Sequence, residues 1–343
     1  MILRMERMVR EASAEYVAVR DGGAGLIDLS ARGRILISGT EAVMFLNGLV
    51  TNDMKTLAVN TWMPAVFPNV QGRLLAAVRV IHRHDGFLID TESATRDTVI
   101  KLLERFTLAG DFHLADLSPE MALLSIQGAK ASETMAATFG ENFALPDRGA
   151  VTSVDWQGKQ LTIIRVTHTA EDGCDVFINA TEAESLRAAF IRAGAEPIRS
   201  EVMETLRIEA GIARYGTDMD ETNVVTETNL DDAVSFSKGC YIGQEIIARI
   251  KYRGHVAKKL TGLIFESEVS LEGGAKIFSV DDKEIGRVTS FAFSPRLNRT
   301  IALGYVKYDY LAAGTSVKAE VGGQQYSATV AALPFVRGSW YSI

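Results

Sequence analysis

Cysteine is scarce in this chain: only Cys174 and Cys240 occur in 343 residues. Two thiols are too few for a disulfide framework, so we expect a reducing, cytoplasmic setting. Long apolar runs are missing as well, and the charged stretch 1–16 lacks the apolar core that a signal peptide needs. No apolar segment approaches the length that crosses a bilayer. We therefore expect no membrane partner.

The chain also lacks any long basic run, and its formal net charge is −7. Both features argue against direct binding of nucleic acid. His82 and His84 would share one face of a strand, but the sequence offers no third ligand beside them, and we predict no metal site. Hydrophobic residues make up 47% of the chain and charged residues 23%, which is ordinary for a globular protein.

What the chain does contain is an alternation of short strands and helices. The order strands, helix, strands, helix appears about twice, which predicts two similar α+β modules rather than one parallel sheet. After residue 258, short alternating runs separated by turn residues predict a small antiparallel barrel or sandwich. We thus predict an α+β fold, with two interleaved modules over residues 1–255 and a β-domain over residues 258–343.

The most distinctive stretch is 238–245, K-G-C-Y-I-G-Q-E. Cys240 follows Lys238 by two residues and lies just ahead of a helix that we predict to begin at Gln244. A lysine and a helix N-terminus both favour the thiolate over the thiol. The stretch is therefore a candidate for an activated cysteine. The alternative is that Cys240 is a small buried residue in a loop.

These residues resemble the signature K-G-C-Y-x-G-Q-E of the YgfZ family, folate-binding relatives of the glycine-cleavage T-protein and of a mitochondrial iron–sulfur assembly factor. The resemblance runs nearly end to end: 49–53 is similar to an early L-x-T-N-D, 206–218 to L-R-x-E-A-G…Y-G-x-D, and 285–305 to the closing barrel. It implies two α+β modules and a C-terminal β-barrel, arranged in a ring around a channel that binds tetrahydrofolate non-covalently.

The resemblance also implies the residues of the folate site. Asp175 falls where the T-protein has a glutamate that holds the pterin ring, and two carboxylate oxygens suit adjacent N–H donors. Arg207 falls where relatives have an arginine near the folate, suited to the carboxylate of the glutamyl tail. Asn52 and Asp53 of the T-N-D motif complete the predicted set. From the residues alone, Asp175 can equally be a surface strand end, Arg207 a solvent-facing helix residue, and the T-N-D turn a cap and loop.

One departure from the family pattern bears on activity. The T-protein has an acidic pair where this chain, aligned on Gly72, has Ala76 and Ala77. Alanine cannot take a proton, so aminomethyl transfer by that mechanism is not expected.

The main functional prediction is a tetrahydrofolate-binding accessory protein for the maturation or repair of iron–sulfur proteins, with iron–sulfur client or assembly proteins as partners. Cys240 would be its functional thiol, and Lys238 would tune the charge of that thiol. The supporting residues of the motif are Gly239, Tyr241, Gly243, Gln244 and Glu245. One alternative is a folate-dependent aminomethyltransferase or other one-carbon transferase that uses another acid, with Asp53 as the nearest candidate. Another is a scaffold with a vestigial folate site.

Overall fold

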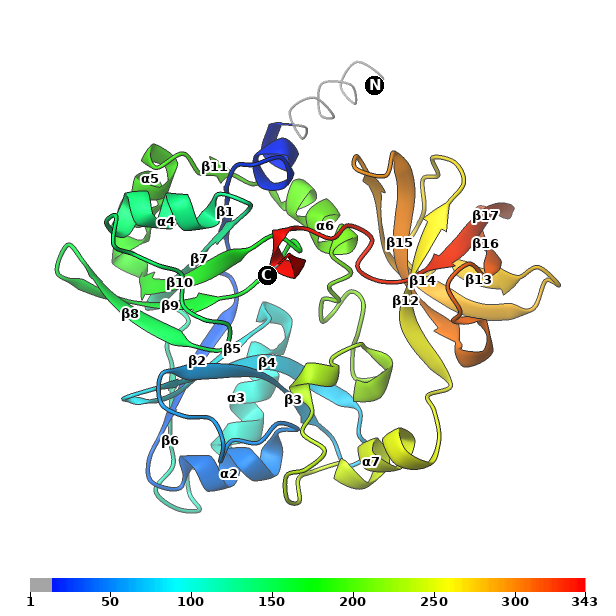
Figure 1. Ribbon diagram of the computed structural model, residues 1–343. Helices are drawn as coiled ribbons and strands as arrows, with labels where there is room; N and C mark the ends of the chain where they lie inside the picture. The colour runs from blue at the N-terminus through cyan, green and yellow to red at the C-terminus, as the bar shows by residue number, and fades with distance from the viewer. Residues whose placement is uncertain (1–13, 343) are drawn as a thin grey trace.

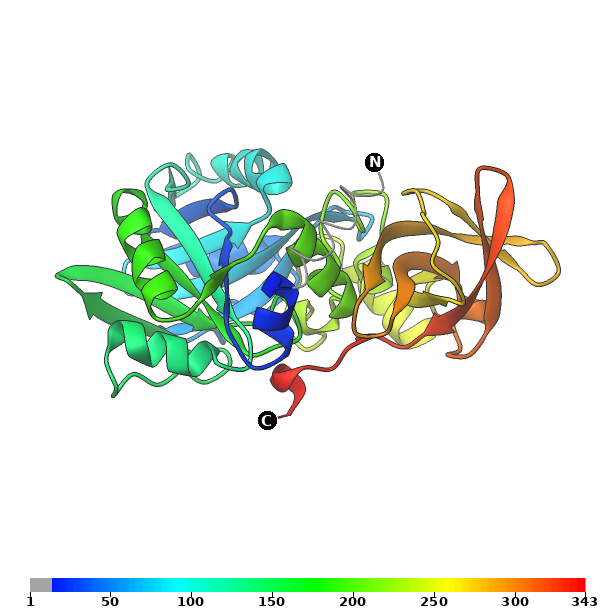
Figure 2. The ribbon, with the colours of Figure 1, turned by 90° about the horizontal axis from the view of Figure 1, so that it is seen from above.

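The computed structural model describes residues 14–342. They form three parts around a common centre: two β-sheets, each with its helices, and a barrel (Figure 1). Figure 2 shows the barrel to one side of both sheets, with helix α6 (Ser200–Glu209) and the end of the chain between them. Segments far apart in the sequence therefore meet at the centre.

The five-stranded sheet has the strand order β3-β4-β5-β2-β6, and helices α2 and α3 cover one of its faces. A hairpin turn at residues 85–86 joins β4 to β5, and Gly86 there takes a positive φ of 136° that favours glycine. The elements of this module are β2 (Gly33–Ser38), α2 (Ala42–Leu49), β3 (Thr61–Pro68), β4 (Leu74–Arg83), β5 (Gly86–Thr91), α3 (Arg96–Glu104) and β6 (His113–Asp116).

The six-stranded sheet has the order β11-β1-β7-β10-β9-β8, with α4 and α5 on one face. Strand β1 belongs to this sheet although it precedes the whole five-stranded module, so the two modules are interleaved in the sequence. The elements are β1 (Gly25–Asp28), β7 (Met121–Gln127), α4 (Ala131–Phe139), β8 (Val151–Trp156), β9 (Lys159–Arg165), β10 (Gly173–Asn179), α5 (Ala183–Arg192) and β11 (Glu196–Pro197).

The faces of the two sheets that the helices leave uncovered pack against each other. Alternation along β4 and β5 turns Ile81 and Leu88 to this side, where they meet Leu123 and Phe177 of the other sheet. We call this buried layer between the sheets the seam. Arg79 lies two residues before Ile81 and so faces the seam too. A charge placed there must be paired, because its desolvation would otherwise be prohibitive.

The third part is a closed antiparallel barrel with the order β12-β15-β14-β13-β16-β17. Residues of its wall, Leu260 and Leu303, pack against Ile208 of α6 and so attach the barrel to the sheets. Helix α7 (Gln244–Arg253) leads into it. The strands are β12 (Lys258–Phe265), β13 (Lys276–Ser279), β14 (Glu284–Ser294), β15 (Arg299–Lys307), β16 (Ser316–Val321) and β17 (Gln324–Ala331).

The C-terminal tail returns from the barrel to the six-stranded sheet (Figure 1). The amide of Val336 donates to the carbonyl of Glu209 over 3.0 Å, and the amide of Trp340 donates to the carbonyl of Ala170 over 3.2 Å. The tail thus lies against the end of α6 and the turn that precedes β10.

These observations confirm the predicted fold class, two sheet modules with a C-terminal antiparallel β-barrel, and they decide for a barrel over a sandwich. Within residues 14–342, the helices are all too short or too polar to cross a membrane.

Candidate functional site

The T-N-D turn and the lysine of the K-G-C motif form one assembly. The ammonium of Lys238 is buried and donates to the carbonyls of Asn47, Val50 and Asn52, over 2.7, 2.9 and 2.6 Å. Two of these carbonyls lie at the end of α2, where a cation is favoured by the helix dipole and by carbonyls that have no partner within the helix. Lys238 therefore joins the long loop before α7 to the five-stranded module.

The same turn also holds the single 3₁₀ turn formed by residues 231–233. Thr51 Oγ1 donates to the carbonyl of Ala233 over 2.6 Å, and Asn52 Nδ2 donates to the carbonyl of Asp232 over 3.1 Å. Asn52 Nδ2 donates as well to the carbonyl of Pro64 on β3, over 2.9 Å. The side chains of the motif are thus used to position backbone, and Asp53 lies next to them, half-buried.

Two glycines explain how the rest of the K-G-C motif sits on the β3–β4 turn. Gly243 has a φ of +78°, and a Cβ there would lie 2.3 Å from the carbonyl oxygen of Asn69. Gly72 also has a positive φ, +69°, and its Cβ would crowd Ile247 at 3.2 Å. Only glycine allows this approach without strain. Tyr241 is buried beside the same contact, and burial raises its pKa to about 12.

Cys240 lies on the surface of this assembly. Its side chain is exposed and its thiol is free, whereas Cys174 is buried in the six-stranded sheet. Gly239 and Glu245 are exposed as well, and Gln244 Nε2 reaches the carbonyl of Lys238 at 3.5 Å. The alternative that Cys240 is a buried loop residue is therefore wrong. Its role as a functional thiol stays a prediction.

Asp175 lies in the seam, and protein groups occupy both of its oxygens. Arg79 Nη1 donates to Asp175 Oδ2 over 2.5 Å, and His168 Nε2 lies 3.0 and 3.1 Å from the two oxygens. Burial opposes ionisation of Asp175, but the charges of His168 and Arg79 outweigh it and hold the pKa of this carboxyl well below its ordinary value. Asp175 is fully buried, so the alternative of a surface strand end is wrong.

The ion pairs continue through Arg79 to the second sheet. Arg79 Nε donates to Asp90 Oδ2 over 2.8 Å, and Arg32 Nη2 donates to the same oxygen over 2.7 Å. Burial opposes ionisation of Asp90 as well, yet Arg32 and Arg79 together lower its pKa. One arginine thus bridges a carboxylate of each sheet.

Arg207 belongs to a third group, where α6 meets the barrel. Its guanidinium donates to Asp218 Oδ2 over 2.6 Å, to Glu204 Oε1 over 2.5 Å and to Ser290 Oγ over 2.9 Å. The side chain is buried, so it does not face solvent as a plain helix-surface residue would. These three partners already use donors of the guanidinium. A contact between Arg207 and a folate tail is not tested and stays a prediction.

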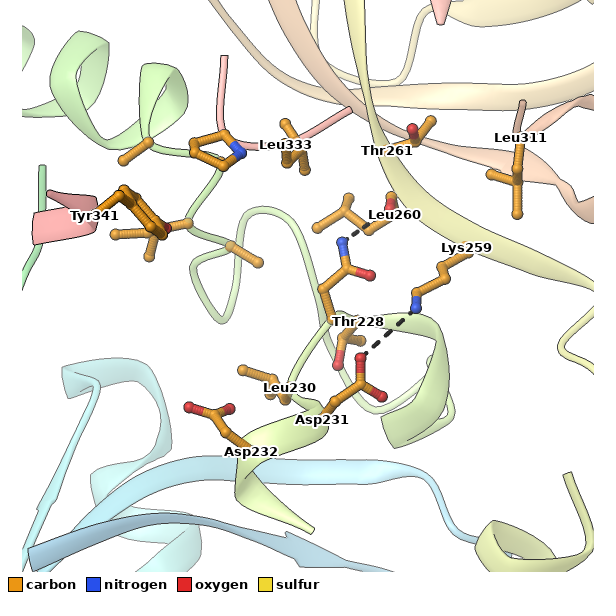
Figure 3. A pocket seen from close by; sticks show the side chains of 16 residues that line it. Thr228, Leu230, Asp231, Asp232, Lys259, Leu260, Thr261, Leu311, Leu333 and Tyr341 are labelled. Atoms are coloured by element: carbon orange, nitrogen blue, oxygen red, sulfur yellow. Dashed lines mark hydrogen bonds and ion pairs between the residues drawn. The ribbon is translucent and has the colours of Figure 1, made fainter. Parts of the chain in front are cut away.

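A cavity of about 610 Å³ lies between the segments 210–213 and 228–232 that follow α6, the barrel and the C-terminal tail (Figure 3). We call it the central cavity. Lys259 of the barrel closes part of its rim through an ion pair of 3.7 Å with Asp231, and Asn229 Nδ2 donates to the carbonyl of Leu260 over 2.9 Å. The carboxylate of Asp232 points into the open space (Figure 3). Apolar side chains, among them Leu333, complete a lining that suits an organic ligand with polar ends.

Three residues at these sites escaped the sequence reasoning. Arg79 could have been found from the sequence, since a charged residue in an otherwise apolar strand indicates a buried ion pair. His168 and Asp232 had no such feature in the sequence, because the contacts of each are with residues distant in the sequence or from other elements. Lys238 was singled out, but the structure directs its ammonium to backbone carbonyls of the T-N-D turn.

The fold and the cavity define a class: a two-module protein closed by a barrel, with a ligand-sized cavity where its parts meet. Comparison with known proteins identifies the family. Residues 4–238 match the GCVT N-terminal domain, and residues 258–337 match the glycine cleavage T-protein C-terminal barrel domain. The chain therefore belongs to the glycine-cleavage T-protein superfamily.

Individual relatives agree. An aminomethyltransferase of Picosynechococcus sp. is 31% identical over 330 residues, which cover 95% of this chain and 90% of the relative. One of Rubrobacter xylanophilus is 32% identical over 294 residues, 85% of this chain and 78% of the relative. The crystal structure of the glycine cleavage system aminomethyltransferase T from Bartonella henselae superimposes with a TM-score of 0.86 at 23% identity, covering 95% of this chain and 90% of that one. That last likeness shows the shared fold.

These relatives correct the main functional prediction. An accessory role in the maturation of iron–sulfur proteins is contradicted, since the matched curated relatives are named aminomethyltransferase. Iron–sulfur proteins as partners go with it. The comparisons favour the alternative that the sequence had placed second, a folate-dependent one-carbon transferase.

Proposed function

We propose that this protein is a tetrahydrofolate-dependent one-carbon transferase of the T-protein type, with an aminomethyl donor as the first substrate class to test. The relatives named aminomethyltransferase, which align along nearly the whole chain, carry this proposal. The central cavity supports it, because a pocket of about 610 Å³ with mixed lining fits a cofactor with a flat ring and a carboxylate tail.

Within the superfamily, we propose the YgfZ branch on the strength of the stretch 238–245. This assignment to a branch is a statement about sequence relationship, not about function. It brings no iron–sulfur partner with it, and a cytoplasmic location likewise remains an expectation. The domain bounds 1–255 and 258–343 are retained as a proposal.

Binding of tetrahydrofolate to the central cavity is tested by calorimetric titration of the wild type and of Leu311→Trp. Leu311 lines the cavity from the barrel side, so a larger side chain there fills space without removing a hydrogen bond. We expect binding on the order of −8 kcal/mol in the wild type, weakened at least tenfold in the variant.

The matched control is Gln160→Trp, which places the same side chain at a second cavity of about 430 Å³ beside the seam. We expect folate affinity to be unchanged there. If folded wild type binds no tetrahydrofolate, the proposed function is wrong. If both variants weaken binding equally, the folate site is not the central cavity. Asp175 and Arg207 are poorer probes, because each is buried in ion pairs and its removal also perturbs folding.

A further inference from the structure

The loop 230–233 presents two adjacent carboxylates in different ways. Asp231 turns to Lys259 and forms an ion pair of 3.7 Å. Asp232 turns the other way, and Figure 3 shows its carboxylate directed into the central cavity. Within residues 14–342, no ion pair joins Asp232 to a cation, and its nearest charged neighbour, Asp231, is negative. A carboxylate that faces a ligand cavity in this way is available for proton transfer.

The backbone that carries Asp232 is held firmly. Asn52 donates to the carbonyl of Asp232 and Thr51 to the carbonyl of Ala233, while Lys238 fixes the carbonyl of Asn52 over 2.6 Å. Two stretches singled out in the sequence, the T-N-D turn and the lysine of the K-G-C stretch, therefore both hold the backbone around this one carboxylate. Support of this kind is what a reacting group needs to keep its geometry.

The positions that carry alanine in place of the T-protein's acidic pair, 76 and 77, lie on β4, and one of them packs against the same segment. Along β4, Ala76 turns to the helix-covered core, whereas Ala77 turns to the other face and packs against the cluster that contains Ala233. An acid at position 76 would be buried among apolar side chains. The side of β4 that faces the centre carries a methyl group at Ala77, and the neighbouring loop supplies a carboxylate from Asp232.

Resting on the proposed function, we propose that Asp232 is the catalytic proton acceptor of this transferase, in place of an acid at positions 76 and 77. An amine nitrogen of tetrahydrofolate attacks the methylene carbon of the aminomethyl donor, and a new N–C bond forms. The bond from that carbon to its ammonium group breaks, and ammonia leaves with the electron pair. The proton of the attacking N–H passes to the Asp232 carboxylate, which then returns it to the departing ammonia. The carbon is now bonded to tetrahydrofolate and to the rest of the donor. Transfer is complete when a second amine nitrogen of tetrahydrofolate displaces that remaining donor group, which leaves with the electrons of its bond to the carbon and takes up the proton of the second N–H.

The charges around Asp232 favour this role. The protein around the cavity removes part of its solvent and raises the pKa of the Asp232 carboxyl, and the negative charge of Asp231 adds to the effect. A raised pKa makes a stronger base. The cations nearby are engaged elsewhere: Lys259 with Asp231, and Lys238 with backbone carbonyls.

The test compares Asp232→Asn with wild type in two separate measurements: calorimetric binding of tetrahydrofolate, and the rate of ammonia release from an aminomethyl donor in the presence of tetrahydrofolate. We expect binding within about threefold of wild type and a rate lowered at least about 100-fold, the range that general bases contribute. The acid limb of the pH–rate profile should disappear in the variant. Asp232→Glu should recover part of the rate.

Two further variants make the result specific. Glu221→Gln removes a charge from an exposed position of the same long loop, outside the cavity lining, and should leave the rate unchanged. Asp53→Asn tests the competing acid. A wild-type rate in Asp232→Asn, or a loss confined to Asp53→Asn, overturns the proposal while folate binding still supports the proposed function. A folded wild type that binds no folate overturns both.

Discussion

The seam and the central cavity treat charged groups in opposite ways. In the seam, cations and anions neutralise one another, because Arg79 bridges Asp90 and Asp175. Beneath the cavity, the cation Lys238 is hydrogen-bonded to backbone carbonyls, and the carboxylate of Asp232 faces the open space of the cavity. The seam uses charge to fix how two sheets pair, and the cavity keeps one charge available.

This difference separates residues that hold the fold from residues that are free to react. The sequence had assigned Asp175 to folate, yet both of its oxygens already have protein partners. It had not assigned Asp232, which has the more accessible carboxylate. A carboxylate already saturated by an arginine and a histidine contributes to stability, whereas one that faces a cavity costs stability and can act on a ligand.

The largest effect should come from breaking the seam. Arg79→Met removes the cation shared by Asp90 and Asp175 and leaves both carboxylates buried with fewer partners. We expect the free energy of unfolding to fall by about 3–5 kcal/mol, the usual cost of removing one partner from a buried pair. Urea denaturation followed by circular dichroism measures it.

The matched control for that loss lies four residues along the same strand. Arg83 pairs with Asp85 at the surface, where solvent screens the interaction. Arg83→Met should cost less than about 1 kcal/mol. Equal losses in the two variants would mean that the seam charges contribute no more than an exposed pair does.

The next effect should come from the assembly beneath the cavity. Lys238→Met leaves three carbonyls without their shared donor and loosens the loop that carries Asp232. We expect a loss of about 2–3 kcal/mol from these unsatisfied groups. Lys259→Met, whose ion pair is partly exposed, should lose less than about 1 kcal/mol. Similar midpoints for both variants in a thermal melt would contradict a structural role for Lys238.

Much of the fold could be predicted from the sequence because its signals are local. Alternation within strands, the turn at residues 85–86 and glycines at positive φ each depend on a few neighbouring residues. The barrel was predictable for the same reason, since evenly spaced short strands need no knowledge of distant partners.

The site was less predictable because its contacts join distant segments. Lys238 reaches carbonyls some 190 positions earlier, between Asn47 and Asn52. No local pattern shows that a lysine before a cysteine serves a turn so far away. The motif could therefore be recognised, while the partner of its lysine could not.

Strong acid should weaken the seam. The pKa values of Asp90 and Asp175 lie below the ordinary aspartate value of 3.8 in the folded protein. Their contribution to stability is therefore complete above that value and is lost as the pH falls below it. Between neutral pH and about pH 3, we expect the free energy of unfolding of Arg79→Met to fall by about 1–2 kcal/mol less than that of wild type. Parallel curves in a series of urea titrations would contradict this linkage.

The smallest effect should have the opposite sign, and it gives the sharpest contrast between the two regions. The pKa of Asp232 is raised in the folded protein, so its contribution favours folding at low pH and is lost as the pH rises through the folded value. At neutral pH the ionised carboxylate is therefore a small cost, which solvent screening keeps to about 0.5 kcal/mol or less. Asp232→Asn should melt at the same temperature as wild type or slightly above it, while Asp175→Asn melts well below. A destabilised Asp232→Asn would place this carboxylate with the structural charges of the seam, and its loss of activity would then no longer distinguish chemistry from folding.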